Sequence, residues 1–178
     1  MLQIVYFILA AVLVGIDQVT KLWASSQLGK AGKVLELWPG VFEFRYSENT
    51  GVAFSLLEGQ RWLFIPLTLI TSVLIAVMLV RSPMRRRFFF SFPCALILAG
   101  GIGNLMDRVA YGFVIDFLYV RLIDFPIFNF ADCCVVVGAI LMFIAVLFGM
   151  KKYEEMPLRT LLFNILVKEK EPKEQNDG

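Results

Sequence analysis

Four long stretches of the chain are almost free of charge. Residues 62–80, 88–106 and 133–150 contain no Asp, Glu, Lys or Arg, and an apolar stretch at residues 1–16 continues past Asp17 to about residue 25. A helix needs about 20 mostly apolar residues to cross the hydrocarbon of a bilayer. The pattern therefore predicts an α-helical membrane protein with four transmembrane helices.

The first stretch has one competing interpretation, a cleaved signal peptide that ends near residues 24–26. Signal peptides begin with a basic region, which is followed by a short apolar core. Residues 1–16 contain no Lys or Arg, and Asp17 and Lys21 interrupt the apolar pattern. We therefore interpret the first stretch as a spanning helix.

Basic residues in the short links predict how the helices are oriented. The link at 81–87 contains four arginines, and Lys151 and Lys152 follow the fourth span. Cytoplasmic loops carry an excess of Lys and Arg. We therefore expect both termini in the cytoplasm and the two longer links, about 26–61 and 107–132, on the outer face.

Composition divides the chain into two parts. Residues 1–150 form the predicted membrane domain, and residues 151–178 contain six basic and six acidic residues with two prolines. Such polar segments do not bury enough apolar surface to fold alone. We expect residues 151–178 to be a charged cytoplasmic tail and assign them no function.

The outer link at 26–61 contains two predicted strands. Residues 41–47 alternate between apolar and polar with a period of two, and residues 34–38 form a second short strand. Pro39 and Gly40 between them suit the central positions of a type II turn. The link is therefore predicted to form a small β-sheet, a cradle on the outer face. Its aromatic face could cover a protein core or dip into the lipid interface, and it consists of Phe42, Phe44 and Tyr46.

Composition excludes several kinds of protein. Hydrophobic residues make up 58% of the 178-residue chain and charged residues 18%, with a mean hydropathy of +0.73, whereas soluble domains are about one quarter charged. The net charge of +2 is too small to indicate nucleic-acid binding. The absence of histidine excludes a His-containing triad and a His-ligated zinc. We expect no cofactor and no metal, since Mg²⁺ and Ca²⁺ need more oxygen ligands in closer array.

The polar residues of the predicted spans collect at one depth. A helix rises about 1.5 Å per residue, so Asp17 lies about 20 Å along the first span from Ile4, and Asn104 about 24 Å along the third from Phe88. The hydrocarbon is about 30 Å thick, and polar groups inside it usually face protein or a wet cavity. The residues predicted in its outer third are Asp17, Lys21, Asn104, Asp107, Arg108 and Asp132.

Several of these residues also have a purely structural interpretation. Asp17 and Lys21 are spaced i, i+4, so they can form an ion pair on one helix face or contact a ligand. Arg108 offers a planar fork of donors for a carboxylate or a carbonyl, and it also suits anchoring at the interface. Asn129 and Asp132, at the start of the fourth span, resemble a capping box.

Two acids of this region have no basic residue close by in sequence. Asp17 has Lys21 four residues later and Asp107 has an arginine beside it, whereas Asp116 and Asp132 have no such neighbour. Two aspartates that share one proton can activate water directly, one as base and one as acid. Without histidine, Asp116 and Asp132 are the candidate pair, although Asp132 could serve as a helix cap alone.

The remaining candidates are assigned structural roles. Asp124 precedes Phe125 and Pro126, and we expect it in an exposed turn. Cys133 and Cys134 could be nucleophiles, but a nucleophilic thiol usually has an activating base or a cationic neighbour, and histidine is absent. Free cysteines are mostly buried, so we expect both to be packing residues.

Five motifs occur along the chain in a fixed order. They are Asp17-Gln18 with Lys21, Asn49-Thr50-Gly51-Val52-Ala53-Phe54, Gly100-Gly101-Ile102-Gly103-Asn104-Leu105-Met106-Asp107-Arg108, Val114-Ile115-Asp116-Phe117 and Phe128-Asn129-Phe130-Ala131-Asp132. Through these motifs the chain resembles the lipoprotein signal peptidases, the bacterial type II signal peptidases, over roughly residues 1–150. The adjacent cysteines and the long charged tail depart from the family's usual pattern.

The resemblance implies a membrane-embedded aspartyl endopeptidase of the bacterial cytoplasmic (inner) membrane. Such an enzyme cleaves the signal peptide of prolipoproteins just before a diacylglyceryl-modified cysteine, near the outer face. The implied partners are this lipid-modified substrate, membrane lipid and globomycin-type inhibitors. The catalytic aspartates map onto Asp116 and Asp132. The substrate-binding or supporting positions map onto Asp17, Lys21, Asn49, Gly51, Asn104, Asp107, Arg108 and Asn129.

A small proton-coupled carrier and a structural membrane protein are the alternatives to an enzyme. Intramembrane acids also mark ion paths, but such a path needs polar groups across the whole membrane, and the inner half of the predicted spans has no comparable cluster. A structural role would leave Asp116 unexplained, because it is a single acid in the apolar, strand-like stretch 112–120.

Overall fold

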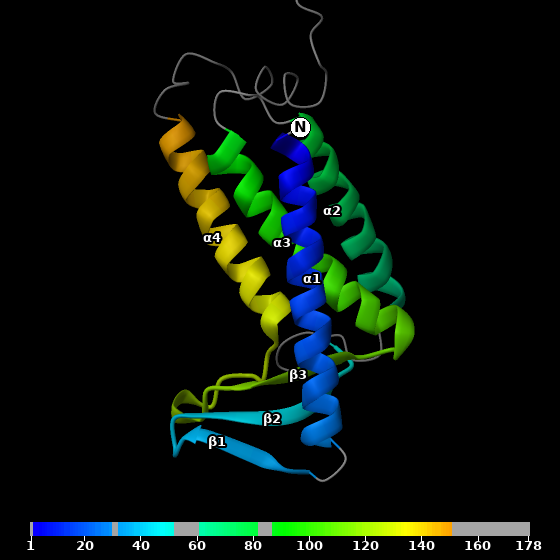
Figure 1. Cartoon of the computed structure of the whole chain (residues 1–178), viewed down its shortest axis with the longest axis vertical. Coiled ribbons are helices and arrows are strands. Elements are labelled where there is room, and N and C mark those ends of the chain that lie inside the picture. The colour runs from blue at the N-terminus through cyan, green and yellow to red at the C-terminus, as the bar shows by residue number, and fades with distance from the viewer. Residues whose placement is uncertain (1, 30–31, 52–60, 82–86, 151–178) are drawn as a thin grey trace, which may run out of the picture.

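The computed structural model describes residues 2–29, 32–51, 61–81 and 87–150. These residues form four helices and a small sheet at one end of the helix bundle (Figure 1). The basic link at 82–86, the segment 52–60 and the predicted tail at 151–178 lie outside the described residues.

The helices agree with the four predicted spans. Their bounds are α1 Leu2–Gln27, α2 Arg61–Arg81, α3 Arg87–Ala110 and α4 Phe130–Met150. Three of them, α1, α3 and α4, are long and apolar enough over their described residues to cross a membrane, and α2 contributes a shorter apolar segment, Ile65–Arg81. The helix bounds lie within a few residues of the predicted limits.

Helix α3 occupies the centre of the bundle and packs against α1, α2 and α4. Glycines permit this close packing. A Cβ atom on Gly100 of α3 would lie 2.3 Å from the carbonyl oxygen of Ala131, and one on Gly138 of α4 would lie 3.0 Å from that of Pro93. The apolar core between α1, α2 and α3 includes Tyr6, Ala10, Leu79, Cys94, Ala95, Leu98 and Ala99.

The outward faces of the helices carry large apolar side chains. On α1 the exposed residues include Ile8, Val12 and Val19, and on α4 they include Ile140 and Phe143. Exposed apolar surface over the length of a helix is unfavourable in water and favourable against lipid chains. The bundle therefore has the surface of a membrane-embedded protein.

The sheet has three antiparallel strands in the order β1-β2-β3. The strands are β1 Val34–Trp38, β2 Phe42–Asn49 and β3 Val114–Tyr119, and a short 3-10 helix, η4 Arg121–Ile123, follows β3. The Val41 N–H donates to the Trp38 carbonyl at 2.9 Å, and Gly40 has a φ of 75°. Both features fit the predicted type II turn.

One face of the sheet packs on the end of α1, which extends beyond the other helices (Figure 1). Phe44 and Tyr46 of β2 contact a small core made by Ala24, Leu28 and Phe117. The sequence left two roles open for the aromatic face, contact with a protein core or with the lipid interface. Phe44 and Tyr46 have the first role, because they cover a protein core. The N-terminal end of α1 and the last turns of α2 and α4 lie at the opposite end of the bundle (Figure 1).

Candidate active site

Backbone pairing between β3 and the segment before α4 positions the first site residues. The Phe128 N–H donates to the Leu118 carbonyl at 3.0 Å, and the Leu118 N–H donates back to Phe128 at 2.8 Å. Asn129 follows directly, just before α4, and its side chain lies beside β3. This pairing brings Asn129 next to Asp116, the residue that the sequence places alone in an apolar strand.

Asn129 and Asp132 form the predicted capping box at the start of α4. The Asp132 N–H donates to the side-chain oxygen of Asn129 at 2.9 Å, and the Asn129 N–H donates to Oδ2 of Asp132 at 3.0 Å. These bonds satisfy backbone donors that the first turn of a helix otherwise leaves unpaired. They also fix the orientation of the Asp132 carboxylate.

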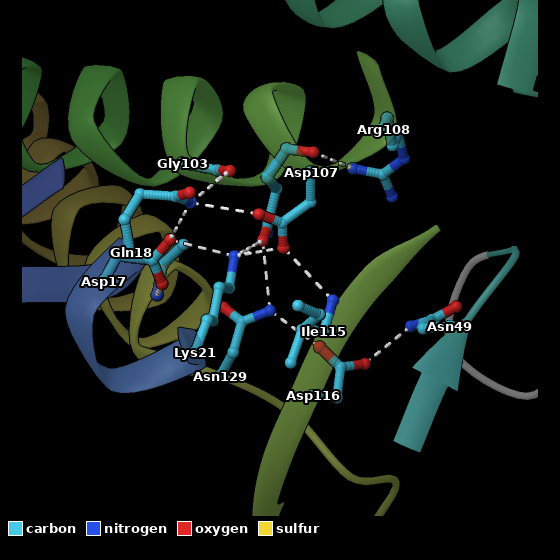
Figure 2. Close-up of polar contacts among 12 residues, drawn as sticks. Asp17, Gln18, Lys21, Asn49, Gly103, Asp107, Arg108, Ile115, Asp116 and Asn129 are labelled. Atoms are coloured by element: carbon cyan, nitrogen blue, oxygen red, sulfur yellow. Dashed lines mark hydrogen bonds and ion pairs between the residues drawn. The ribbon is translucent and has the colours of Figure 1, made fainter. Parts of the chain in front are cut away.

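The carboxyl group of Asp116 accepts a hydrogen bond on each oxygen. The side-chain amide of Asn129 donates to Oδ1 at 2.6 Å, and that of Asn49, at the end of β2, donates to Oδ2 at 2.9 Å. The Gly51 N–H donates to the side-chain oxygen of Asn49 at 3.0 Å and so orients this amide. Figure 2 shows Asn49 and Asn129 approaching Asp116 from opposite sides.

Asn104 connects the two carboxyl groups from the α3 side. Its Nδ2 donates to Oδ1 of Asp132 at 2.7 Å, and its Oδ1 accepts from Asn129 at 3.0 Å and from Lys21 at 2.8 Å. Asn129 contacts Asp116 and Asn104 through the same Nδ2 group. Asp116 and Asp132 therefore belong to one hydrogen-bonded network that contains both asparagines.

A buried ionic cluster supports this network. The Nζ of Lys21 lies 2.9 Å from Asp17 and 2.8 Å from Asp107, and all three side chains are about 1% exposed. Asp17 accepts a bond from the Ala131 N–H at 2.9 Å, and Asp107 accepts one from the Ile115 N–H at 3.1 Å. These backbone groups immediately precede Asp132 and Asp116, so the cluster fixes the chain beside each carboxylate. Figure 2 shows the bond from Ile115 to Asp107 beside Asp116.

The ion pairing includes a contact that the sequence did not predict. Asp107 has Arg108 beside it in sequence, and the structure pairs it with the buried cation of Lys21, which Asp17 shares. The guanidinium of Arg108 donates to the Asn104 carbonyl oxygen at 3.3 Å. The spacing along a single helix could not reveal that α1 supplies the cation for an acid on α3.

The environment of Asp116 raises the pKa of its carboxyl group to about 7. Burial is the main cause, because a low-dielectric surrounding disfavours the charged form. The negative charge of Asp132 acts in the same direction, while the hydrogen bonds from Asn49 and Asn129 partly oppose it. A carboxyl group of this kind can retain a proton near neutral pH.

A cavity of about 260 Å³ lies beside Asp132. It opens between α2, α3 and α4, and the two glycines in its wall contribute no side chains to fill it. Asn104 and Asp132 in its lining belong to the network described above. The lining residues are Thr68, Gly100, Gly101, Asn104, Arg108, Asp132, Val135 and Val136.

Most of the residues singled out in the sequence meet in this network. Sequence reasoning assigned no role to Gln18, whose side-chain amide donates to Asp17 at 3.2 Å and to Asp107 at 3.0 Å. The position of this amide, next to Asp17 inside an apolar helix, could have indicated that Gln18 belongs to the site. Cys134 is buried and Cys133 half-buried, both as free thiols, and Asp124 is exposed as expected.

No group of three or more His, Cys, Asp or Glu side chains in the described ranges is arranged to bind a metal ion. The donors in the network are amides, a lysine and backbone N–H groups, which suit carboxylates rather than cations. Hydrogen-bond donors thus surround both carboxyl groups of Asp116 and Asp132.

Fold and site together define a multi-span membrane protein with a pair of carboxyl groups at one end of its bundle, Asp116 buried and Asp132 half-buried. The family described as signal peptidase (SPase) II matches residues 9–148. The chain therefore belongs to the signal peptidase II family, which is a family of peptidases. This result confirms the resemblance derived from the five sequence motifs.

Individual relatives agree with the family match. A lipoprotein signal peptidase of Enterococcus faecalis is 40% identical over 154 residues, which cover 86% of this chain and 94% of the relative. One of Lactococcus lactis subsp. cremoris is 41% identical over 78% of this chain and 92% of its own length.

Two solved structures of bacterial membrane enzymes are also similar. The first has a TM-score of 0.76 at 30% identity and covers 86% of this chain and 94% of its own. The second has a TM-score of 0.72 at 32% identity, with 80% and 92% covered. The four-helix membrane fold with its small sheet is thus confirmed.

Proposed function

We propose that this chain is an aspartyl endopeptidase that removes the signal peptide of prolipoproteins, cutting just before the diacylglyceryl-modified cysteine. The names of the relatives support the substrate. One observation carries the catalytic type: Asn129 donates its side-chain amide to Asp116 and its backbone N–H to Asp132. One residue thereby orients both carboxyl groups of the pair.

The proposed chemistry is general acid–base hydrolysis. One aspartate removes a proton from water as the water oxygen attacks the scissile carbonyl carbon. The other, which is protonated, donates a hydrogen bond to the carbonyl oxygen and then helps to protonate the leaving amine as the C–N bond breaks. The raised pKa of Asp116 supports one retained proton at neutral pH, and that proton belongs to the pair as a whole.

The other site residues have supporting roles in this proposal. Asn49, oriented by Gly51, and Asn104 each donate to one aspartate of the pair. Arg108 lines the cavity beside Asp132, where its planar donors could contact a substrate carbonyl. The ionic cluster positions the backbone next to the pair and consists of Asp17, Lys21 and Asp107.

The arrangement of charge supports an active site near the outer face of a bacterial inner membrane. Arg81 ends α2 at the end of the bundle opposite the sheet (Figure 1), and cytoplasmic ends carry an excess of basic residues. Both termini would then be cytoplasmic. Among the described residues, no buried Asp, Glu, Lys or Arg lies at that end, which favours a peptidase over a proton-coupled carrier.

The test is incubation of the purified full chain with a diacylglyceryl-modified prolipoprotein, followed by mass analysis. We expect one cut before the modified cysteine, no cut in the unmodified precursor, and inhibition by globomycin. Asp116→Asn is the matched inactive control. Cleavage elsewhere, or equal cleavage of the unmodified precursor, would contradict the proposed substrate.

A further inference from the structure

The two faces of the sheet differ sharply in chemistry. Residues paired across strands share a face, so Leu35 lies with Phe44, and Trp38 lies with Phe42. Phe42 and Phe44 contact each other edge to face at 5.8 Å. This apolar face is turned toward α1, since Phe44 also contacts Trp23 at 5.5 Å.

The opposite face is charged and internally paired. Glu43 lies across from Glu36 and Tyr119, and its carboxylate is 2.6 Å from Arg45. Arg121 bonds to Glu36 at 3.1 Å and reaches Glu43 at 3.4 Å. The charged side chains therefore neutralise one another on one face and leave the apolar face without charge.

The described residues cover only part of the apolar face. Phe44 packs on the end of α1, but Trp38, at the β1–β2 turn, is 67% exposed. The backbone N–H of Leu122 in η4 donates to the carbonyl of Val41 at 3.3 Å, which places η4 beside this turn. Leu122 and Ile123 are also 67% exposed, so three large apolar side chains gather at one end of the sheet.

This apolar end lies far from the carboxyl pair. Asp116 lies across from Ser47, whereas Trp38 lies across from Phe42. Phe42 and Ser47 are five residue steps apart along β2, or about 17 Å at roughly 3.3 Å per step. In Figure 1 this end of the sheet projects sideways from the bundle, below α4.

We propose that the apolar end of the sheet, formed by Trp38, Leu122 and Ile123, inserts into the outer leaflet of the bilayer as an interfacial anchor. The apolar surface is continuous with lipid-facing α1, from Val19 through Trp23 to the phenylalanines of β2. Tryptophan is favoured at the membrane interface because its ring is apolar and its N–H is polar. The anchor holds the sheet, and β3 with it, at a fixed height over the membrane.

Lipid contact by this anchor follows from the membrane-embedded fold and does not depend on the proposed catalytic function. Its test is tryptophan quenching in the full chain, reconstituted in lipid nanodiscs without substrate. Phe replaces the other two tryptophans, Trp23 and Trp62, which leaves Trp38 as the only fluorophore. The matched control adds Trp38→Phe and Glu36→Trp, which moves the fluorophore to the charged face of the same strand.

We expect lipids brominated near the glycerol end of their chains to quench Trp38 several-fold more strongly than the Glu36→Trp control. Aqueous iodide should show the reverse order. Adding Leu122→Gln and Ile123→Gln should reduce the quenching of Trp38 by lipid. Two results would overturn the proposal. In the first, iodide quenches Trp38 as strongly as it quenches the control. In the second, neither quencher reaches Trp38, which would show that protein covers this surface.

Discussion

Asn129 and Asp132 cap each other at the start of α4, each accepting on its side chain the backbone N–H of the other. The same Asn129 also donates its side-chain amide to Asp116. A local helix-start motif thus becomes the link between two acids that lie on different elements. Asp132 is therefore both a cap residue and a candidate catalytic group, and the two roles make different predictions.

Replacing either acid by asparagine separates these roles. Asn keeps the size and most hydrogen bonds of Asp but cannot exchange a proton. We expect Asp116→Asn and Asp132→Asn each to lower kcat for a lipid-modified substrate by about 10³-fold or more, and the double variant to lose little more, since residues of one chemical step are not additive. Turnover and thermal stability should be measured together.

If Asp132 were a cap alone, Asp132→Asn would be nearly silent, because asparagine is itself a good capping residue. Substantial turnover by either single variant at normal stability would therefore reject the pair. Cys133→Ser provides a control at the residue next to Asp132. We expect it to retain most activity, since the thiol is interpreted as a packing group.

Substitutions of Asn129 test its role in orienting the pair. Serine is a good capping residue, but it cannot reach Asp116 and Asn104 as the Asn129 amide does. Asn129→Ser should therefore keep more stability than Asn129→Ala, with a difference of about 1 kcal/mol. Both variants should lose most of their kcat. Normal kcat in Asn129→Ser would show that the side-chain amide has no positioning role.

The buried ionic cluster gives a prediction about stability. Lys21→Met leaves the carboxylates of Asp17 and Asp107 buried without their shared cation, which typically costs about 3–5 kcal/mol. Adding Asp17→Asn and Asp107→Asn removes the unpaired charges and should restore part of the melting temperature. The measurement is thermal unfolding in detergent. A single Lys21→Met variant with an unchanged melting temperature would contradict the buried-pair interpretation.

The sequence was sufficient to predict the four long helices and β2 but not the polar contacts between elements. Charge-free runs predicted the helices, and the period of two predicted β2, because both patterns follow from local geometry. The bonds from Lys21 to Asn104 and from Ala131 to Asp17 join residues 83 and 114 positions apart. Only packing brings such groups together, so their pairing could not be predicted from spacing.

Two adjacent glycines of α3 test the packing around the site. A Cβ on Gly100 would lie 2.3 Å from the Ala131 carbonyl oxygen and 2.6 Å from Val135, whereas one on Gly101 would lie 3.3 Å from the Ser72 hydroxyl. Alanine gains up to about 1 kcal/mol over glycine in a helix, while overpacking costs about 1–3 kcal/mol. We expect Gly100→Ala to lower the melting temperature and Gly101→Ala to be near neutral. Equal effects would contradict the close contact of α3 and α4.

The last prediction concerns pH. Cleavage requires one proton on the pair, and the pKa of Asp116, about 7, means that this proton is lost as the pH rises through that value. We therefore expect kcat/KM to fall above about pH 7. The hydrogen bond from Asn49 favours the ionised form of Asp116, so Asn49→Ala should raise the pKa and move this alkaline limb to higher pH, even as the rate decreases.

Glu48→Gln is the matched control for this profile, because it removes an exposed carboxylate beside Asn49 that bonds to Tyr46. Its alkaline limb should coincide with that of the unmodified chain. The profiles should be recorded as kcat/KM, which reports ionisations of the free enzyme. A limb that stays in place or moves to lower pH in Asn49→Ala would show that Asp116 does not carry the proton that controls cleavage.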